Sequence, residues 1–523
     1  MIELQTDIAV IGGSLGGVMA AWQACRAGRY VVLTHEHDWL GGQLTAQGVP
    51  PDEHSLIETA GASASYRAFR AAMRQHYLDQ PDFVDRTEMT EGTNPGDGWV
   101  SRLCIEPRVA ASYLQALLQP FVDRGLLRII RTAAVVSAWR QERRVEGVVV
   151  RAASGVVSIR ARYVIDATDT GEVIALAGLP YRLGKEAQSD FGEADAPALA
   201  QTADQQPVTQ VLALRREASA GPLMAKPEAY DFWCRYLLPH YGYPLFSNRI
   251  PGSGRGSSIA LPWFGEGQTL DLWRYRRVVS ARNWRTPRAE VSLINWAQND
   301  YALQPLLDGG LPEAEVVAHA RQLSLSFAYW LQTAAPRPDG GTGYPELQLA
   351  GDVLGTSDGL AQQVYVRESR RIVGLDCLNQ TDIAYDGGLL TPVNRPDSVG
   401  TVWYNIDIHP TCVSGHGTNA RARPFTLPLG SFIPAQCDNL IPACKNISVS
   451  HLVNAATRVH PAEWLIGEVA GLLAVHALDS GLQPALIHAS DARRAEFQSC
   501  LTAAGIPLAW DAAQVATRTA STH

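Results

Sequence analysis

The chain has 523 residues and a mass of 56.7 kDa, more than one hydrophobic core usually supports, so we expect two or more domains. Its 44 Lys and Arg residues against 52 Asp and Glu residues give a formal charge of −8, which offers no basic surface to a nucleic acid. Hydrophobic residues at 46% and charged residues at 18% are ordinary for a folded globular protein. The composition therefore excludes the nucleic-acid-binding classes.

No signal peptide or membrane span is expected, because the first strand begins close to Met1 and no apolar run approaches the roughly 18 residues of a span. We therefore expect a soluble, cytoplasmic protein that does not bind a membrane. The cysteines form no C-x-x-C pair, which argues against an iron–sulfur cluster or a structural zinc site, so no metal is predicted. The eight cysteines are Cys25, Cys104, Cys234, Cys377, Cys412, Cys437, Cys444 and Cys500.

Residues 7–45 have the pattern of a βαβ unit that binds a dinucleotide. An apolar run at 8–11 leads into a glycine cluster at 12–17 and then into an Ala-rich helix. Glycines after a strand let the backbone turn tightly and bring its N–H groups to a pyrophosphate at the positive end of a helix. The middle glycine of the usual G-x-G-x-x-G is Ser14 here, and Glu36 lies where a ribose ligand is expected. The pattern predicts a nucleotide site and leaves the nucleotide open.

Two later features favour FAD over a nicotinamide nucleotide. A second glycine turn, Gly41-Gly42, directly follows the ribose-binding strand, where an extended FAD needs close approach of the backbone. The strand at 163–167 then runs into Thr168 and a glycine turn at Gly171, an arrangement that passes under the FAD pyrophosphate. We therefore predict FAD as the cofactor.

The pattern of the chain predicts an α/β fold: a Rossmann-like FAD-binding domain, in which a β-meander is inserted into a parallel sheet, plus a second α+β substrate or cap domain. The meander is expected as four short strands, at 127–131, 135–138, 145–151 and 156–160. Helices are predicted at 66–74, from Pro107 to Gly125, at 312–332 and at 461–474, and a last strand at 438–443.

Residues 208–404 hold most of the 13 tryptophans. We predict that these aromatic side chains form the core of the second domain, the alternative being that some of them line a substrate pocket. The helix that begins near Pro461 is expected to direct its free N–H groups at the N1/O2 edge of a reduced isoalloxazine. Gly467 and Gly471, one turn apart on that helix, would allow close packing against a backbone or a ring.

With these residues in place, the chain resembles the FAD-dependent oxidoreductase family whose members open with a glycine turn of the Gly-Gly-Thr-Pro-Ala-Gly type. The resemblance extends along most of the chain and implies a glutathione-reductase-like FAD domain built from residues 1–190 and 400–480, a cap domain at 191–399 and a helical C-terminal segment at 481–523. The matching stretches are 38–45 with 50–54, 166–171 with 177–178, 272–277, 295–296 with 299–301, 367–372, 407–409, 438–440 and 467–471.

Two positions depart from the family pattern. His35 stands where a glutamate commonly ends the second strand, so the ribose ligand is either His35 or Glu36. Cys444 replaces the glycine of a late Ala-Gly-Lys turn. Together with the glycine turns, the resemblance gives this set of cofactor-binding residues: Gly12, Ser14, Leu15, Gly16, Gly17, His35, Glu36, Gly41, Gly42, Gln43, Val135, Ala167, Thr168, Gly171, Lys445, Asn446, Arg458 and His460.

The catalytic residues are predicted just before the last strand. Alternation along a strand places Asp407 and His409 on one face, where the carboxylate would orient the imidazole as a base. Tyr404 and His451 are the further candidates. A structural hydrogen-bonding role is the alternative for each histidine.

Arg367, Arg370 and Arg371 could bind a substrate carboxylate or the FAD pyrophosphate, but we expect at least two of them to be structural. The predicted function is an FAD-dependent oxidase or dehydrogenase that removes a hydride from a C–N or C–O centre of a small polar molecule. One alternative is a monooxygenase that uses NAD(P)H and oxygen as co-substrates. Another is a scaffold protein that binds flavin without catalysis. The sequence leaves the oligomeric state open.

Overall fold

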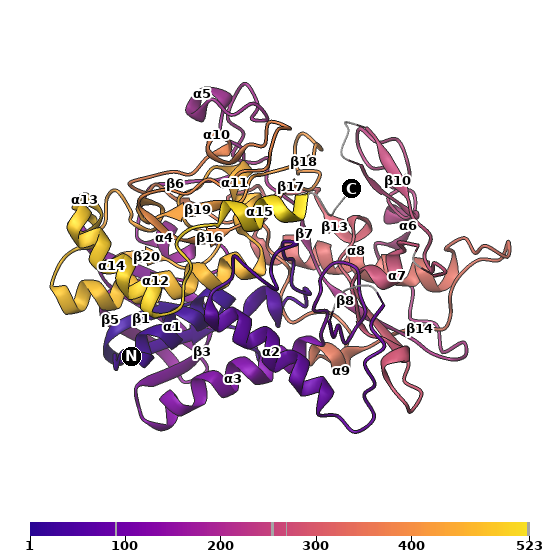
Figure 1. The fold of residues 1–523 in the computed structure, drawn as a ribbon. Coiled ribbons are helices and arrows are strands. Elements are labelled where there is room, and N and C mark those ends of the chain that lie inside the picture. The colour runs from indigo at the N-terminus through magenta and orange to yellow at the C-terminus, as the bar shows by residue number, and fades with distance from the viewer. Residues whose placement is uncertain (89–91, 253–255, 268, 520–523) are drawn as a thin grey trace.

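The computed structural model describes the whole chain except residues 89–91, 253–255, 268 and 520–523. Its N-terminal and C-terminal segments come together in one region, which contains β1, α1 and α12, and the middle of the chain forms a second region beside it, with β8, β14 and α8 (Figure 1). This arrangement brings segments that are several hundred residues apart in sequence to a common boundary.

A mixed sheet forms the centre of the first region and confirms the predicted α/β, Rossmann-like fold. Its parallel part has the order β3-β2-β1-β5-β20, and β4 pairs antiparallel with β3 and β5. The strands that carry this sheet are β1 (Ile2–Ile11), β2 (Val31–His35), β3 (Leu127–Gln141), β4 (Arg144–Ala152), β5 (Gly155–Asp166) and β20 (Leu440–Pro442).

The meander has fewer and longer strands than predicted. The two segments expected at 127–131 and 135–138 are one strand, β3, whose register shifts near residues 132–137 while it changes partner from β2 to β4. The last meander strand likewise continues into the returning strand as β5. The prediction of separate strands was wrong because a local irregularity in the ladder interrupts the alternation of side chains without ending the strand.

Two helices cross at the glycine turn with their backbones in close contact: α1 (Leu15–Arg26) and α12 (His460–Ser480). A Cβ added at Gly467 would overlap the carbonyl oxygen of Gly16, and a Cβ at Gly471 would lie 2.5 Å from the carbonyl oxygen of Ala20. The predicted close packing of the two glycines is thus confirmed, and the partner is the α1 backbone.

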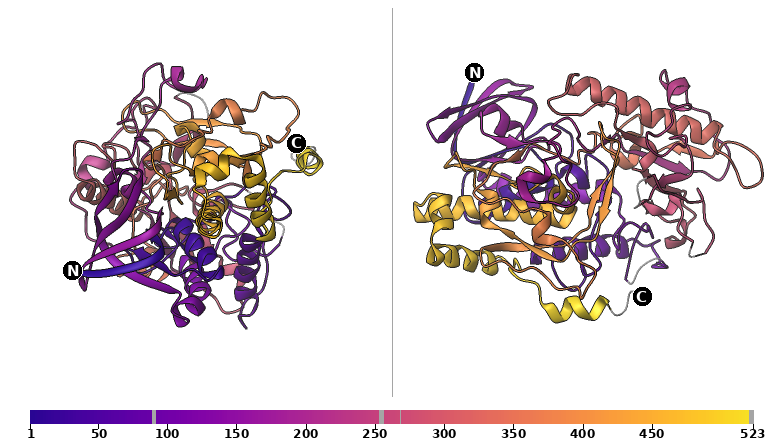
Figure 2. Two further views of the ribbon diagram at one scale, coloured as in Figure 1. Left: turned by 90° about the vertical axis from the view of Figure 1, so that its left-hand side faces the viewer. Right: turned by 90° about the horizontal axis from the view of Figure 1, so that it is seen from above.

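By length and composition α12 could cross a membrane, which corrects the statement that no apolar run comes near that length. In the fold, however, 78% of its most apolar window is buried, and it lies near the middle of the molecule, as the left view of Figure 2 shows end-on. A core helix of this kind is apolar on all sides because protein surrounds it.

The second region is built on an antiparallel sheet of order β11-β12-β8-β14, which comprises β8 (Leu212–Arg216), β11 (Arg277–Val279), β12 (Glu290–Ile294) and β14 (Leu347–Leu349). The helix α8 (Glu313–Thr333) packs in its core. Most of the tryptophans of the middle region are buried here, as predicted for a core: Trp233, Trp263, Trp273, Trp296 and Trp330. Trp284 instead joins the core of the first region, and Phe232 is exposed.

Further helices surround these cores. They include α2 (Ala64–Leu78), α3 (Pro107–Asp123), α11 (His451–Thr457), α13 (Pro484–Ala489), α14 (Asp491–Ala503) and α15 (Ala512–Thr519). The strands that matter for the sites are β7 (Val208–Thr209), β13 (Asp300–Tyr301), β17 (Ile406–Ile408) and β18 (Thr418–Ala420). The cluster around α1 and α12 also includes Leu378, Ile383 and Val399, so the domain division at residues 190 and 400 stays a prediction.

Candidate functional site

A cavity of about 420 Å³ lies at the carboxyl ends of β1, β2 and β5, where open α/β sheets bind nucleotides. Its walls come from the glycine turn, the end of β2, the end of β5, and segments of the second region. The residues from the first region are Gly12, Gly13, Ser14, His35, Glu36, His37, Trp39, Gly42, Ala46, Ala133, Ala134, Ala167, Thr168, Asp169, Thr170 and Glu172.

The glycine turn is shaped by close approach of backbones. Gly12 has a φ of +107°, and a Cβ there would overlap the Ala167 carbonyl group. Ser14, which replaces the middle glycine of the motif, is the N-cap of α1, and its Oγ accepts a hydrogen bond of 3.2 Å from the Gly17 N–H. The departure from the motif therefore keeps the turn and adds a cap to the helix.

Polar atoms without partners surround the end of β2. Nδ1 of His35 and Nε2 of His37 have no hydrogen-bond partner among the described residues, and both histidines line the cavity. Glu36 opens onto the same space, and its pKa is raised to about 7 by desolvation among its neighbours and by the charges of Asp169 and Glu313. This set of unsatisfied groups fits the hydroxyls and ring nitrogens of a nucleotide, so the residues present fit FAD. The ribose ligand stays open between His35 and Glu36.

A buried ionic network lies behind this cavity. Lys445 Nζ is 2.6 Å from Asp169 Oδ1 and 3.1 Å from Glu463 Oε2, and Glu463 Oε1 accepts a hydrogen bond of 3.3 Å from the Gly16 N–H. Lys445 thus ties the end of β20 to α1 and α12. Burial, followed by the charge of Glu463, raises the pKa of the Cys444 thiol well above its usual range, so Cys444 is an unreactive thiol.

The predicted cofactor residues fall into three groups. Gly12, Ser14, His35, Glu36, Gly42, Ala167 and Thr168 line the cavity. Val135 and Gly171 form the second group: they do not line the cavity themselves, but their chain neighbours do. These neighbours are Ala133 and Ala134 before Val135, and Thr170 and Glu172 on either side of Gly171. The remaining residues are not brought to the cavity surface: Leu15, Gly16, Gly17, Gly41, Gln43, Lys445, Asn446, Arg458 and His460.

His460 has a structural position instead. Its Nδ1 accepts a hydrogen bond of 3.1 Å from the Asp52 N–H, so the proton is on Nε2, which lies 3.1 Å from the Val49 carbonyl oxygen. Burial lowers the pKa of His460 to about 4. The ring is therefore neutral, and it fastens the loop around residue 50 to the start of α12.

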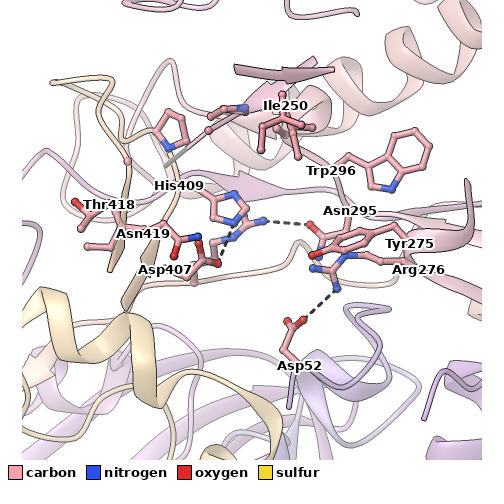
Figure 3. Close-up of a pocket in the computed structure, with 18 of the residues that line it drawn as sticks. Asp52, Ile250, Tyr275, Arg276, Asn295, Trp296, Asp407, His409, Thr418 and Asn419 are labelled. Carbon is pink, nitrogen blue, oxygen red and sulfur yellow. Dashed lines mark hydrogen bonds and ion pairs between the residues drawn. The ribbon is translucent and has the colours of Figure 1, made fainter. Parts of the chain in front are cut away.

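A second cavity of about 390 Å³ lies where the two regions meet (Figure 3). Its polar walls come from widely separated segments: Asp52, Tyr275, Arg276, Asn295, Trp296, Tyr365, Arg367, Tyr404, Asp407, His409 and Arg458. Ile250, Ile259 and Leu261 add an apolar surface. Three of the four predicted catalytic residues, Tyr404, Asp407 and His409, are thus brought together here.

His409 lies between two carboxylates. Its Nδ1 is 2.5 Å from Asp300 Oδ2, and its Nε2 is 3.6 Å from Asp407 Oδ2. The predicted pair of Asp407 and His409 is therefore found, but the closer partner of the ring is Asp300. Asp407 also accepts from the guanidinium of Arg458, at 3.4 Å to Oδ2 and 2.9 Å to the backbone oxygen.

The charges around His409 determine its protonation. Burial and the Arg367 charge act to lower the pKa of His409, but Asp300 and Asp407 outweigh them, so the pKa lies above its usual value. Burial acts to raise the pKa of Asp300, while Arg367 and His409 lower it to about 2. Burial acts to raise the pKa of Asp407 as well. The hydrogen bond and charge of His409 and the charge of Arg458 outweigh it, so this pKa lies well below its usual range. Both carboxylates are therefore ionised and hold the imidazole between them.

His451 does not reach this cavity. It is buried, with Nδ1 at 2.7 Å from Glu186 Oε2, and Glu186 is held in turn by Arg371 at 2.8 Å. His451 lines neither of the two cavities, so the structure separates it from the other predicted catalytic residues. A Ser-His dipeptide at a helix N-terminus does not indicate on its own which way the ring points.

Two of the three neighbouring arginines have structural partners, as expected. Arg371 pairs with Glu186 and Glu368, and Arg370 pairs with Asp308 at 2.7 Å. Arg367 lines the second cavity, but its terminal nitrogens bind Asp300, Asn295, Thr209 Oγ1 and the Pro207 carbonyl oxygen. None of the three lines the cofactor cavity, so the pyrophosphate role finds no support.

Three residues of this site were missed from the sequence: Arg276 and Asn295, which line the second cavity, and Asp300, which contacts His409 without lining the cavity. All three lie in stretches that carry the family resemblance, at 272–277, 295–296 and 299–301. The family resemblance was therefore the only signal in the sequence that could have pointed to these residues. No local pattern around the three stretches shows that they face residues 404–409.

A glycine turn at the edge of a parallel sheet, a nucleotide cavity beside it and an adjoining polar pocket define a dinucleotide-binding enzyme. The chain belongs to the FAD-dependent oxidoreductase family, since the family model described as FAD dependent oxidoreductase matches residues 7–501. The protein is thus an FAD-dependent oxidoreductase. No curated protein sequence matches the chain significantly.

Similar solved structures share little sequence with the chain. A geranylgeranyl bacteriochlorophyll reductase-like protein from Thermoplasma acidophilum is 10% identical over 96% of this chain and 84% of its own, with a TM-score of 0.33. A mutant E. coli quinol fumarate reductase is 12% identical over 100% and 74%, with a TM-score of 0.30. An L-proline dehydrogenase from P. horikoshii is 16% identical over 32% of this chain and 23% of its own, with a TM-score of 0.19. Similarity this low carries no argument about the substrate.

Proposed function

We propose that the protein is an FAD-dependent dehydrogenase or oxidase that removes a hydride from a C–N or C–O centre of a small polar molecule bound in the 390 Å³ cavity. The observation that supports this most is His409, which lines the cavity between the ionised carboxylates of Asp300 and Asp407. When bound, FAD supplies the hydride acceptor for such a reaction.

The side chains divide the remaining work. Because Nδ1 of His409 is hydrogen-bonded to Asp300, Nε2 is the nitrogen that can take a proton from a substrate O–H or N–H. Asp300 fixes the ring orientation and stabilises the imidazolium that results. Arg458 holds Asp407 in place and donates to the Tyr365 hydroxyl at 2.8 Å. Tyr404 closes the cavity beside them, and because burial raises its pKa well above the usual value, it stays a neutral hydroxyl.

A cytoplasmic location is also proposed. All eight cysteines are free thiols in the structure, which suits a reducing compartment.

The test is anaerobic reduction of the flavin in the purified holoenzyme by a library of small amines and alcohols. At least one compound class is expected to bleach the flavin absorbance, and His409→Gln should slow that bleaching without loss of flavin. Rapid NADPH consumption with a hydroxylated product would support a monooxygenase instead. A flavin that no donor reduces would support the scaffold alternative.

A further inference from the structure

We propose that the cavity around His409 takes an anionic substrate, a small carboxylate, and that Arg276 binds its carboxylate group. This inference rests on the proposed function and specifies its substrate class as carboxylic acids that bear an oxidisable C–OH or C–NH group.

The first observation concerns the polar atoms that lack partners. Among the described residues that line this cavity, every buried side-chain atom without a hydrogen-bond partner is an N–H donor, and none is an acceptor. A buried donor left unpaired is costly, so this wall favours a ligand rich in acceptor oxygens. The donors are Nε and Nη1 of Arg276, Nδ2 of Asn295, Nε1 of Trp296, Nε of Arg367 and Nε of Arg458.

The second observation singles out Arg276 among the three arginines of the cavity. Arg367 and Arg458 use their terminal nitrogens on protein acceptors: Asp300 and Asn295 for the former, Tyr365 and Asp407 for the latter. The nearest carboxylate of Arg276 is Asp52, whose Oδ1 is 3.7 Å from Nη1, beyond hydrogen-bond distance. Arg276 is only 8% exposed. Its guanidinium keeps its charge, as arginine does in proteins, and two of its three nitrogens, Nε and Nη1, are buried without a hydrogen bond.

The third observation is the placement of these groups. In Figure 3, Arg276 and Asn295 lie on one wall of the cavity, and His409 and Asp407 lie on the opposite wall. A molecule that spans the cavity can therefore place an anionic group on Arg276 and a protonated oxygen or nitrogen near His409. The planar fork of a guanidinium matches a carboxylate with two parallel hydrogen bonds, which favours a carboxylate.

The reaction of such a substrate balances. Oxidation of HC–OH to C=O, or of HC–NH to C=N, breaks one C–H bond and one O–H or N–H bond. Bound FAD would accept the hydride and its two electrons, and Nε2 of His409 takes the proton. The carboxylate on Arg276 takes no part in bond making, so Arg276 binds and orients the substrate.

The test is a titration of the oxidised holoenzyme with benzoate and, separately, with its neutral analogue benzamide. The change in the flavin absorbance measures binding in both titrations. Benzoate is expected to bind at least tenfold more tightly than benzamide. Arg276→Gln should weaken benzoate at least tenfold and leave benzamide unchanged. Arg282→Gln, which removes a charge from an exposed arginine of the same region, should leave both unchanged.

Equal affinity for benzoate and benzamide would overturn the inference, as would unchanged benzoate affinity in Arg276→Gln. Arg276→Lys, which keeps the charge and loses the fork, should bind benzoate with intermediate affinity and serves if the glutamine variant does not fold. Binding needs no turnover, so benzoate binding to an enzyme whose flavin no donor of the library reduces would count against the proposed function and not against the carboxylate site. Efficient oxidation of amines or alcohols that lack an acid group would contradict only the inference that the substrate is a carboxylate.

Discussion

The two cavities are built in different ways. The first region lines the cofactor cavity with short turns at the ends of its strands, at 12–14, 35–37 and 167–170, and residues of the second region line the other side. The pocket around His409 is lined by side chains from many separate stretches, among them residue 52, 250–252, 259–261, 275–276, 295–297, 365–367, 404–410, 417–419 and 458. A site shaped by backbone turns depends on local sequence, whereas a site shaped by side chains depends on which segments the fold brings together.

The two cavities also differ in how their charges are arranged. Around the cofactor cavity, Lys445 is buried between Asp169 and Glu463 and holds elements together. Around His409, ionised carboxylates and arginines leave buried N–H donors without partners among the residues that line the pocket. Substitutions at the glycine turn should therefore change folding and flavin content together, and those around His409 should change reactivity and substrate affinity at constant flavin content.

The largest effect is expected for Gly16→Ala. The added Cβ would overlap the carbonyl oxygen of Ala443, and neither α1 nor the buried end of β20 can move away easily. We expect a loss of roughly 3 kcal/mol or more in the free energy of unfolding, together with loss of bound flavin, measured by denaturant titration and by the ratio of flavin to protein absorbance.

Gly310→Ala is the matched control. Gly310 is exposed, and an added Cβ there meets nothing within 4 Å, so its variant should resemble the wild type. If Gly16→Ala keeps its flavin and its stability, the close contact between the start of α1 and Ala443 is not what shapes the cofactor cavity.

His409→Gln should have the next largest effect, on the reaction alone. Loss of the base is expected to reduce the rate of flavin reduction by roughly 10² to 10⁴, with flavin content and melting temperature close to wild type. Stopped-flow absorbance measures the rate. His76→Gln, on the exposed side of α2, controls for the loss of a histidine. A parallel loss of flavin in His409→Gln would contradict the separation of the two cavities.

Asp300→Asn should move the pH dependence. The reaction needs neutral His409, whose pKa lies above its usual value because of the two carboxylates, so kcat/KM should rise with pH through that pKa. Removal of the Asp300 charge lowers the pKa and should shift the acid limb downward by roughly 1 pH unit. Asp407→Asn should shift it less, because its oxygen is 3.6 Å from the ring rather than 2.5 Å. An acid limb that does not move in either variant would show that His409 is not the titrating base.

The smallest effect is expected for Ser14. Ser14→Ala removes the N-cap of α1 and should cost about 1 kcal/mol of stability, whereas Ser14→Gly, which restores the usual glycine, should cost only a few tenths. Thermal melts of the two variants measure the difference. Equal melting temperatures for alanine, glycine and the wild type would mean that the cap contributes nothing to the cofactor turn.

Much of the cofactor region was predictable. The strand, glycine turn and helix at 8–26, the Gly41-Gly42 turn, α3 and α12 follow from periodicity and turn residues that act within a few positions. Alternation along β17, continued by the residue that follows it, was enough to place Asp407 and His409 side by side. The number of meander strands was wrong because register shifts in β3 interrupt that alternation.

The sequence by itself determined the class of the fold, the glycine turn and the pair of Asp407 and His409, since each depends on neighbours along one strand or one helix. Only the tertiary structure decided that Asp300 is the closer partner of His409, that His460 is structural, that His451 lies elsewhere and that Arg276 faces the pocket. These positions depend on the packing of segments more than 100 residues apart, and local patterns carry no information about which distant segments meet.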